Sequence, residues 1–222
     1  MVPKPQQVKS MDSPLHIVFA LYPSITQLDF TGPYEVFSRL PGARVTVASL
    51  DGGELRTEHG LTFTGLGRLA DVRDCTLLCV SGGMDQSAAM TEPFLAQLRR
   101  LADQATYITS VCNGSLLLGA AGLLRGKRSA CHWAVRPLLE KYGALPDAAR
   151  VVRDGKLITG GGVTAGIDFA LTVAAEIAGP TVAQTIQLLL EYAPAPPFNA
   201  GRPETASPEV LRAFSEWSAA YS

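Results

Sequence analysis

The chain has 222 residues, of which 47% are apolar and 18% are charged, so it can bury one substantial core. Disorder and a second large domain are therefore not expected. Its 19 Lys and Arg residues nearly balance its 20 Asp and Glu residues, and a formal charge of −1 offers no field that attracts nucleic acid or an anionic membrane. No apolar run reaches the roughly 18 residues of a membrane-spanning helix. The polar N-terminus lacks the apolar core of a signal peptide, which predicts a cytoplasmic protein.

Helix-like and strand-like patterns alternate along the chain. Short apolar runs bounded by Gly or Pro predict buried strands, and apolar residues at helical spacing predict helices. This alternation indicates an α/β fold with a mostly parallel sheet and helices on both faces. In chain order, we expect a strand at 16–22, a helix at 34–38 begun by Pro33, a strand at 44–49, a peripheral hairpin of 54–57 with 61–64, a strand at 75–80, a helix at 92–105, a strand at 107–111, helices at 115–124 and 134–142, a hairpin of 151–153 with 157–159, and helices at 165–178, 181–190 and 208–219.

The predicted organisation has three parts. Residues 1–15 are expected to be a flexible tail, and residues 16–200 a single α/β domain. A Pro-rich segment ends the domain, and residues 201–222 are expected to be an extension that forms a packed helix.

The four cysteines are Cys75, Cys79, Cys112 and Cys131. A chain of this length does not need disulfide crosslinks, so we expect free thiols. The chain has only three histidines and no paired ligand spacing of the zinc type, which predicts that no metal is bound.

Small molecules bind at the carboxyl ends of the strands in open α/β sheets, so residues just after each strand are the candidates for chemistry. Three such places stand out: the loop with Asp29, the turn of Gly82 and Gly83, and the turn with Cys112. Small residues flank Cys112 two positions away on either side, which is typical of a strand-to-helix nucleophile elbow. A helix N-terminus at this position would favour the thiolate. The alternative is a buried cysteine that merely ends a strand.

The partners of such a thiol are few. Asp29 is either a turn or cap residue, or a partly desolvated acid with a raised pKa. The turn of Gly82 and Gly83 either aims N–H groups at a ligand or is an ordinary turn. His132 could approach Cys112, but a structural role, bonded to the backbone before the next helix, explains it better. Asp168 in the first turn of its helix is expected to be structural.

At these positions the chain resembles the DJ-1/PfpI superfamily, and within it the branch that hydrates isocyanides. The likeness covers about residues 16–207. The motifs that match are Gln27-Leu-Asp-Phe-Thr-Gly-Pro33, Ser81-Gly-Gly83, Thr109-Ser-Val-Cys112 with Gly114-Ser115, Leu118-Gly-Ala-Ala-Gly-Leu123, His132-Trp-Ala134, Thr159-Gly-Gly-Gly162, Thr164-Ala-Gly-Ile-Asp-Phe-Ala170 and Glu191-Tyr-Ala-Pro-Ala-Pro-Pro-Phe-Asn-Ala-Gly201.

The resemblance implies a flavodoxin-like sandwich, a homodimer and a cofactor-free reaction. An isocyanide and water would be the substrates and an N-substituted formamide the product. Cys112 would attack the isocyanide carbon to give a thioimidate, and Asp29 would be the acid and base. Backbone amides near Gly82, Gly83 and Asn113 would bind the substrate or hold developing charge.

One position departs from the isocyanide-hydrating branch. Asn113 stands where that branch has Thr, and its amide could still donate to the sulfur. The peptidase branch has His there, which argues against proteolysis. Class I glutamine amidotransferases need a late His-x-Glu, which this chain lacks after His132. The alternative function is a ligand-binding protein or a sensor whose Cys112 is oxidised.

Overall fold

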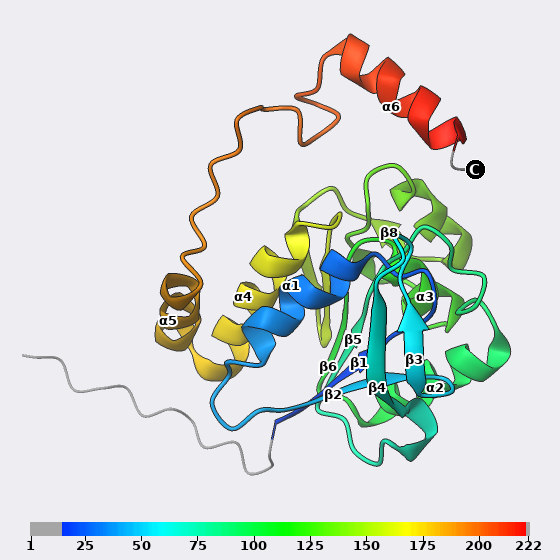
Figure 1. Ribbon diagram of the computed structural model, residues 1–222, viewed down its shortest axis with the longest axis vertical. Coiled ribbons are helices and arrows are strands. Elements are labelled where there is room, and N and C mark those ends of the chain that lie inside the picture. Colours follow the sequence, from blue (N-terminus) through cyan, green and yellow to red (C-terminus); the bar gives the residue numbers. More distant parts are fainter. Residues whose placement is uncertain (1–14, 221–222) are drawn as a thin grey trace, which may run out of the picture. The chain divides into compact units, whose positions relative to one another are not determined.

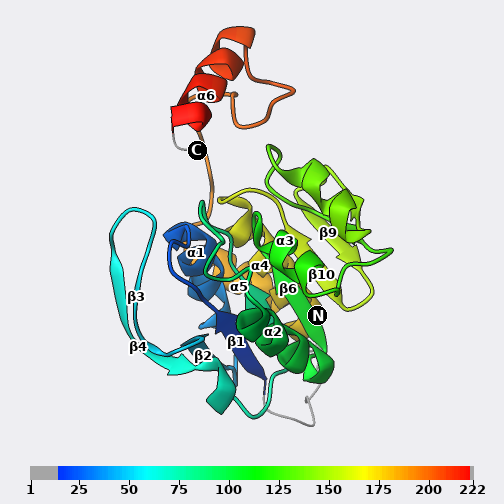
Figure 2. The same ribbon diagram turned by 90° about the vertical axis from the view of Figure 1, so that its right-hand side faces the viewer.

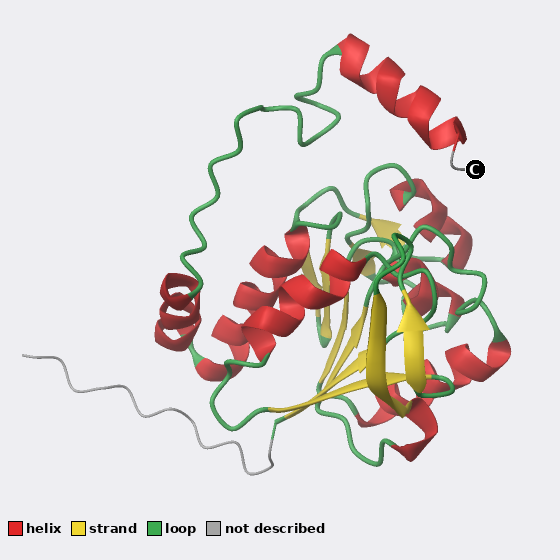
Figure 3. Cartoon of the chain, in the orientation of Figure 1, coloured by secondary structure: helices red, strands yellow, loops and turns green. Residues whose placement is uncertain are grey.

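The computed structural model describes residues 15–220 (Figures 1 and 3). The predicted N-terminal tail lies outside the described residues, except for Leu15. The chain divides into two compact units, one that ends at Leu190 and one of Glu191–Ser222. Among the described residues, none of the helices is both long and apolar enough to cross a membrane.

A mostly parallel sheet forms the centre of the first unit. Within the described chain it has eight strands in the order β3-β4-β2-β1-β5-β6-β10-β9. All neighbouring pairs are parallel except β3 with β4 and β9 with β10. The predicted α/β class is therefore confirmed. The strands are β1 (His16–Ala20), β2 (Arg44–Ser49), β3 (Gly53–Arg56), β4 (Thr62–Arg68), β5 (Leu77–Val80), β6 (Tyr107–Ser110), β9 (Val151–Asp154) and β10 (Leu157–Gly160), and a separate pair is formed by β7 (Arg128–Ser129) and β8 (Leu145–Pro146).

Helices cover both faces of this sheet. Helices α1, α4 and α5 lie on one side, and α2 and α3 lie on the other (Figures 1 and 2). Their bounds are α1 (Gln27–Phe37), α2 (Glu92–Gln104), α3 (Gly114–Ala120), α4 (Ala165–Ala178) and α5 (Pro180–Leu189), with short 3-10 helices η1 (Leu69–Asp71) and η2 (Arg136–Tyr142). In the second unit, α6 (Pro208–Ala220) follows a segment without helix or strand.

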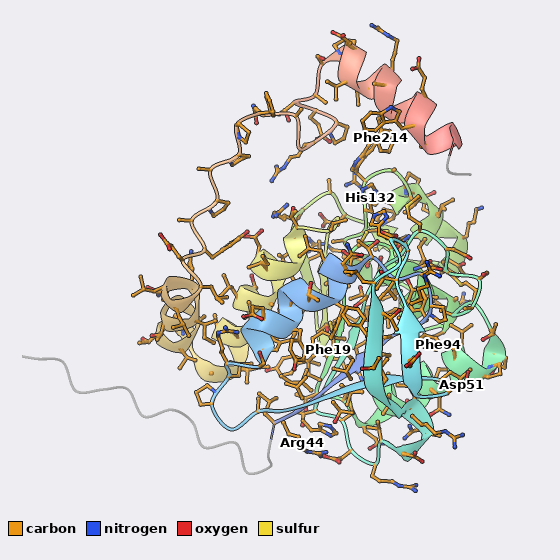
Figure 4. The ribbon with its side chains drawn as sticks, viewed as in Figure 1. Phe19, Arg44, Asp51, Phe94, His132 and Phe214 are labelled. Atoms are coloured by element: carbon orange, nitrogen blue, oxygen red, sulfur yellow. The ribbon has the colours of Figure 1, made fainter. Side chains whose placement is uncertain are left out.

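The central strands are apolar along their whole length because both of their faces are covered. Every residue of β1 and of β5 is buried. Phe19 of β1 packs against Phe30 and Phe37 of α1, and Phe94 of α2 packs against Tyr22 just after β1 (Figure 4). This packing fixes the carboxyl ends of the strands, where the candidate residues lie, relative to the helices.

Three predicted helices differ from the structure. The helix expected at 115–124 is α3, which already ends at Ala120, because Gly122 takes a left-handed φ of +80° shortly after it. Helix α1 begins at Gln27 rather than at Pro33, so Asp29 lies in its first turn and not in a loop. Pro33 is accepted inside the helix because α1 packs closely on α4, where a Cβ on Gly166 would lie 3.1 Å from Pro33 Cδ. Residues 136–142 form a 3-10 helix, in which Leu138 N–H donates to the Val135 carbonyl.

Candidate active site

Cys112 occupies the sharp turn between β6 and α3. Its φ is +58°, a left-handed conformation that few residues other than glycine adopt. The turn is held by the Cys112 N–H, which donates to the carbonyls of Gly160 at 3.2 Å and Gly161 at 2.8 Å. Position 114 must be glycine, because a Cβ there would lie 2.4 Å from the Val80 carbonyl oxygen. The elbow that the small residues predict is therefore present.

The Asp29 carboxyl group and Cys112 converge on Gly82, which follows β5. A Cβ built on Gly82 would lie 2.5 Å from Asp29 Oδ2, 2.8 Å from Cys112 Cβ and 2.4 Å from Asn113 Oδ1. The absence of a side chain at position 82 thus permits the close approach of groups from α1 and from the elbow. The structure brings together Asp29, Gly82, Cys112 and Asn113, as the strand-end argument predicts.

Burial dominates the electrostatics of Asp29. The residue is fully buried, and neither carboxyl oxygen accepts a hydrogen bond of ordinary geometry from the described residues. Burial raises the Asp29 pKa to about 7, contact with the Cys112 side chain and the Gly82 N–H lowers it, and the charge of Glu58 raises it. Of the two sequence interpretations, the desolvated acid is the one that the structure supports.

The Cys112 thiol is also shielded from water, with 6% of the residue exposed. Burial, and then the charge of Asp29, raise the Cys112 pKa well above its usual value, while the backbone N–H groups of Val163 and Asn113 lower it. The dominant effect of burial is opposite to the expectation that the helix N-terminus favours the thiolate. Because the thiol and the carboxyl group are in contact, they titrate as one coupled pair.

The Asn113 side chain closes a second turn instead of facing the sulfur. Asn113 Oδ1 accepts from the Gly83 N–H at 2.9 Å, and Asn113 Nδ2 donates to the Gly83 carbonyl at 2.8 Å. Gln86 Nε2 donates to the Asn113 carbonyl at 2.9 Å. The amide of Asn113 and the N–H of Gly83 are engaged with each other, which differs from the expectation that they are free to donate to the sulfur or to a substrate.

The histidines lie outside this convergence. His132 is half-buried (Figure 4), its Nδ1 accepts from the Ala134 N–H at 3.3 Å, and its ring packs on Gly162. Burial lowers the His132 pKa. His16 lies at the opposite end of β1, where it contacts Arg44 and Asp74. The structural interpretation of His132 thus agrees with its contacts.

Two further predictions concern metals and Asp168. Asp168 lies in the first turn of α4 and pairs with Arg150, which agrees with a structural role. In the part of the chain that the structure describes, there is no cluster of three or more His, Cys, Asp or Glu side chains suited to a metal ion.

Two residues of the site carry no signal in the sequence. Glu58 lies in the turn of the β3–β4 hairpin, which the sequence suggests is peripheral, yet its charge acts on Asp29. Tyr22 donates its O–H to the Ser81 carbonyl at 3.2 Å and lies near Asp29, and burial raises its pKa. Both contacts join segments far apart in the chain, so no local pattern predicts them.

Known proteins resemble this chain in both sequence and fold. Residues 16–176 match the model of the DJ-1/PfpI family. The chain belongs to the DJ-1/PfpI family. Isonitrile hydratase of Pseudomonas putida is 50% identical over 198 residues, which are 89% of this chain and 87% of that enzyme. The crystal structure of a ThiJ/PfpI family protein from Pseudomonas syringae superimposes with a TM-score of 0.93 at 41% identity, covering 100% of this chain and 92% of the other.

Transcriptional regulators are more distant relatives of this DJ-1/PfpI protein. The HTH-type regulator CdhR of Pseudomonas aeruginosa is 31% identical over 172 residues. The alignment covers 74% of this chain but only 51% of the regulator. The resemblance predicted from the sequence motifs and the sandwich fold that it implies are both confirmed.

Proposed function

We propose that the protein is an isonitrile hydratase, a hydro-lyase that adds water to R–N≡C to give the formamide R–NH–CHO. The observation that supports this most directly is the convergence of Asp29 and Cys112 on Gly82 in a buried site. The 50% identity to an isonitrile hydratase over most of both chains supports the choice of substrate class.

In the proposed first step, the Asp29 carboxylate accepts the thiol proton of Cys112 as the sulfur attacks the terminal carbon of the isonitrile. A C–S bond forms, and the electron pair of the terminal carbon then accepts the proton back from Asp29. The product is the thioimidate R–N=CH–S–Cys112, and Asp29 is again a carboxylate. A pKa of about 7 suits a group that both takes and returns a proton at neutral pH.

In the proposed second step, water attacks the thioimidate carbon. Asp29 takes a proton from this water and delivers it to the nitrogen, which leaves a tetrahedral carbon bonded to sulfur, hydroxyl and nitrogen. The C–S bond then breaks, and the hydroxyl proton passes through Asp29 to the departing sulfur. The formamide is released with the Cys112 thiol and the Asp29 carboxylate restored.

The supporting groups have separate tasks in this proposal. The backbone N–H groups of Val163 and Asn113 stabilise the departing sulfur, since both favour its charged form. Gly82 lets the acid reach the nucleophile, and the Asn113 side chain fixes the Gly83 backbone. Gly82, Gly83 and Asn113 therefore shape the binding site through their backbone.

The direct test is a turnover assay. Purified protein is mixed with cyclohexyl isocyanide, and loss of the isonitrile stretching band in the infrared is followed together with formation of N-cyclohexylformamide by mass spectrometry. We expect multiple turnovers per chain without an added cofactor. Formamide formation no faster than with the Cys112→Ala protein would overturn the proposed function.

A cysteine-oxidation sensor is the competing function, and the state of the thiol argues against it. Peroxide oxidises thiolates, and sensor cysteines have low pKa values and good solvent access. Cys112 has a raised pKa and is buried. The site is therefore better suited to a reaction in which the Cys112 thiol loses its proton only after the substrate has bound.

The proposed assembly is a homodimer. Helix α5 exposes two large apolar side chains, Leu188 at 81% and Leu189 at 68% of their surface, which a second copy could cover. Sedimentation equilibrium is expected to give twice the 23.5 kDa mass of the chain. A monomer at micromolar concentration would contradict this assembly.

A further inference from the structure

Glu58 is a nearly buried carboxylate in the turn of the β3–β4 hairpin, which projects from the edge of the sheet (Figure 2). Its side chain is only 10% exposed. Glu58 Oε2 accepts from the hydroxyl of Thr26 at 2.9 Å and from the N–H of Met84 at 3.1 Å. One carboxylate oxygen thus joins two loops that are far apart in the chain.

The first loop precedes the helix that carries Asp29, and the second loop carries Gly82, against which Asp29 lies. Thr26 precedes α1, and its carbonyl accepts from the Asp29 N–H at 3.0 Å. Met84 follows the turn of Gly82 and Gly83, and the Thr26 N–H donates to the Gly82 carbonyl at 3.1 Å. Although Thr26 is the residue before the helix, its hydroxyl makes no capping bond and binds Glu58 instead. Glu58 therefore adds a side-chain link between the Asp29 segment and the Gly82 segment, beside the backbone bond from Thr26 to Gly82.

The backbone of the hairpin turn reinforces this connection. The Ser24 N–H donates to the Arg56 carbonyl at 2.9 Å, and the Glu58 N–H donates to the Ile25 carbonyl at 3.1 Å. The turn is thereby fixed to the loop between β1 and α1 independently of the Glu58 side chain. A change of the side chain alone should leave this attachment in place.

Several titratable groups face Asp29 and Glu58. Around Asp29 they are Cys112 from the elbow, Tyr22 from the end of β1, Cys79 from β5, Cys131, and Glu58 from the hairpin. Beside Glu58, the imidazole Nε2 of the exposed His59 lies 3.3 Å from Oε1, and the Arg56 guanidinium packs on Gly60 of the same turn. Among these groups, Glu58 does not belong to the Asp29–Cys112 pair, and its negative charge opposes the ionisation of Asp29.

We propose that Glu58 is a positioning residue of the reaction: its carboxylate ties the Asp29 and Gly82 segments together and places a negative charge near the Asp29–Cys112 pair. The expected effect of Glu58 on turnover rests on the proposed function. Its expected effect on the ionisation of Asp29 and Cys112 does not. The hairpin, which looks peripheral in the sequence, thereby acts on the reaction through Asp29.

The decisive variant is Glu58→Gln, because the Gln carbonyl can still accept from Thr26 and Met84 while the charge is lost. Removing a nearby negative charge favours ionisation of Asp29. We therefore expect the acid limb of the kcat/KM profile to move to lower pH by about half a unit or more. Glu54→Gln is the matched control, since it removes the same charge from an exposed position of the same hairpin and should leave the limb in place.

A second readout does not need isonitrile turnover. Alkylation of Cys112 by iodoacetamide, quantified by peptide mass spectrometry between pH 5 and 9, reports the ionisation of the pair. Glu58→Gln should move this profile in the same direction, and the shift should vanish when Asp29→Asn is already present. A shift in alkylation without any hydration activity would support the inference on Glu58 and refute the proposed function.

Three results would overturn the inference. The first is an unchanged acid limb in a Glu58→Gln protein of normal melting temperature, and the second is a shift that persists in the Asp29→Asn background. The third is failure of both Glu58→Gln and Glu58→Ala to fold, because it would make Glu58 a residue of the fold rather than of the site.

Glu58→Ala removes both the contacts and the charge. It should show the same shift of the acid limb together with a lower kcat/KM at every pH.

Discussion

Cys112→Ser is expected to lower isonitrile hydration by at least about 10³-fold, and Cys112→Ala to abolish it. A serine hydroxyl is a much weaker nucleophile than a thiol, and a carboxylate with a pKa of about 7 is too weak a base to ionise it. Initial rates of formamide formation, measured at saturating isonitrile, check this result.

The fold should survive these substitutions. Ala and Ser fit the space of the Cys112 side chain and keep the left-handed backbone, so we expect at most about 1 kcal/mol loss in the free energy of unfolding. Cys75→Ala, which removes another buried thiol, is the control and should retain full activity. More than a tenth of the normal rate in Cys112→Ser would show that the sulfur is not the nucleophile.

Asp29→Asn is expected to lower the hydration activity strongly and to raise the stability of the fold. Hydration should fall by about 10²- to 10⁴-fold, because an amide of the same shape cannot take and return a proton. Stability should rise above neutral pH, because a buried carboxyl group that must ionise there is replaced by a neutral one.

The raised pKa of Asp29 determines how the stability difference between Asp29→Asn and the unmodified protein changes with pH. The Asp29 pKa is raised from 3.8 to about 7 on folding, so its favourable contribution is complete below about pH 4 and is lost as the pH rises through 7. The free energy of unfolding of Asp29→Asn, relative to the unmodified protein, should therefore increase by a few kcal/mol between pH 4 and pH 8.

Urea denaturation at several pH values measures this difference directly. Asp51→Asn, at an exposed position before β3 (Figure 4), is the control for the loss of a carboxyl group that folding does not bury. A stability difference for Asp29→Asn that is constant from pH 4 to pH 8 would mean that Asp29 is not desolvated in the folded protein.

Much of the fold could be predicted because its strongest signals are local. The four apolar residues of β5 and the helical spacing in α2 each report burial within a few residues. Helix α4 has the bounds that the sequence predicts, 165–178. The start of α1 could not be predicted, because the usual rule for Pro33 is overridden by packing against α4, which follows about 130 residues later in the chain.

The sequence by itself identified the candidate nucleophile: the small residues around Cys112 and the strand before it are a local pattern, and they also indicate the family to which the chain belongs. Only the tertiary structure decided what that thiol faces. Asp29, Glu58 and Cys112 lie on three separate segments, and the pKa values of the reacting pair depend on their separation and on the water that packing excludes. Neither quantity is encoded in any short stretch of sequence, because Coulomb energy and desolvation depend on distances between distant parts of the chain.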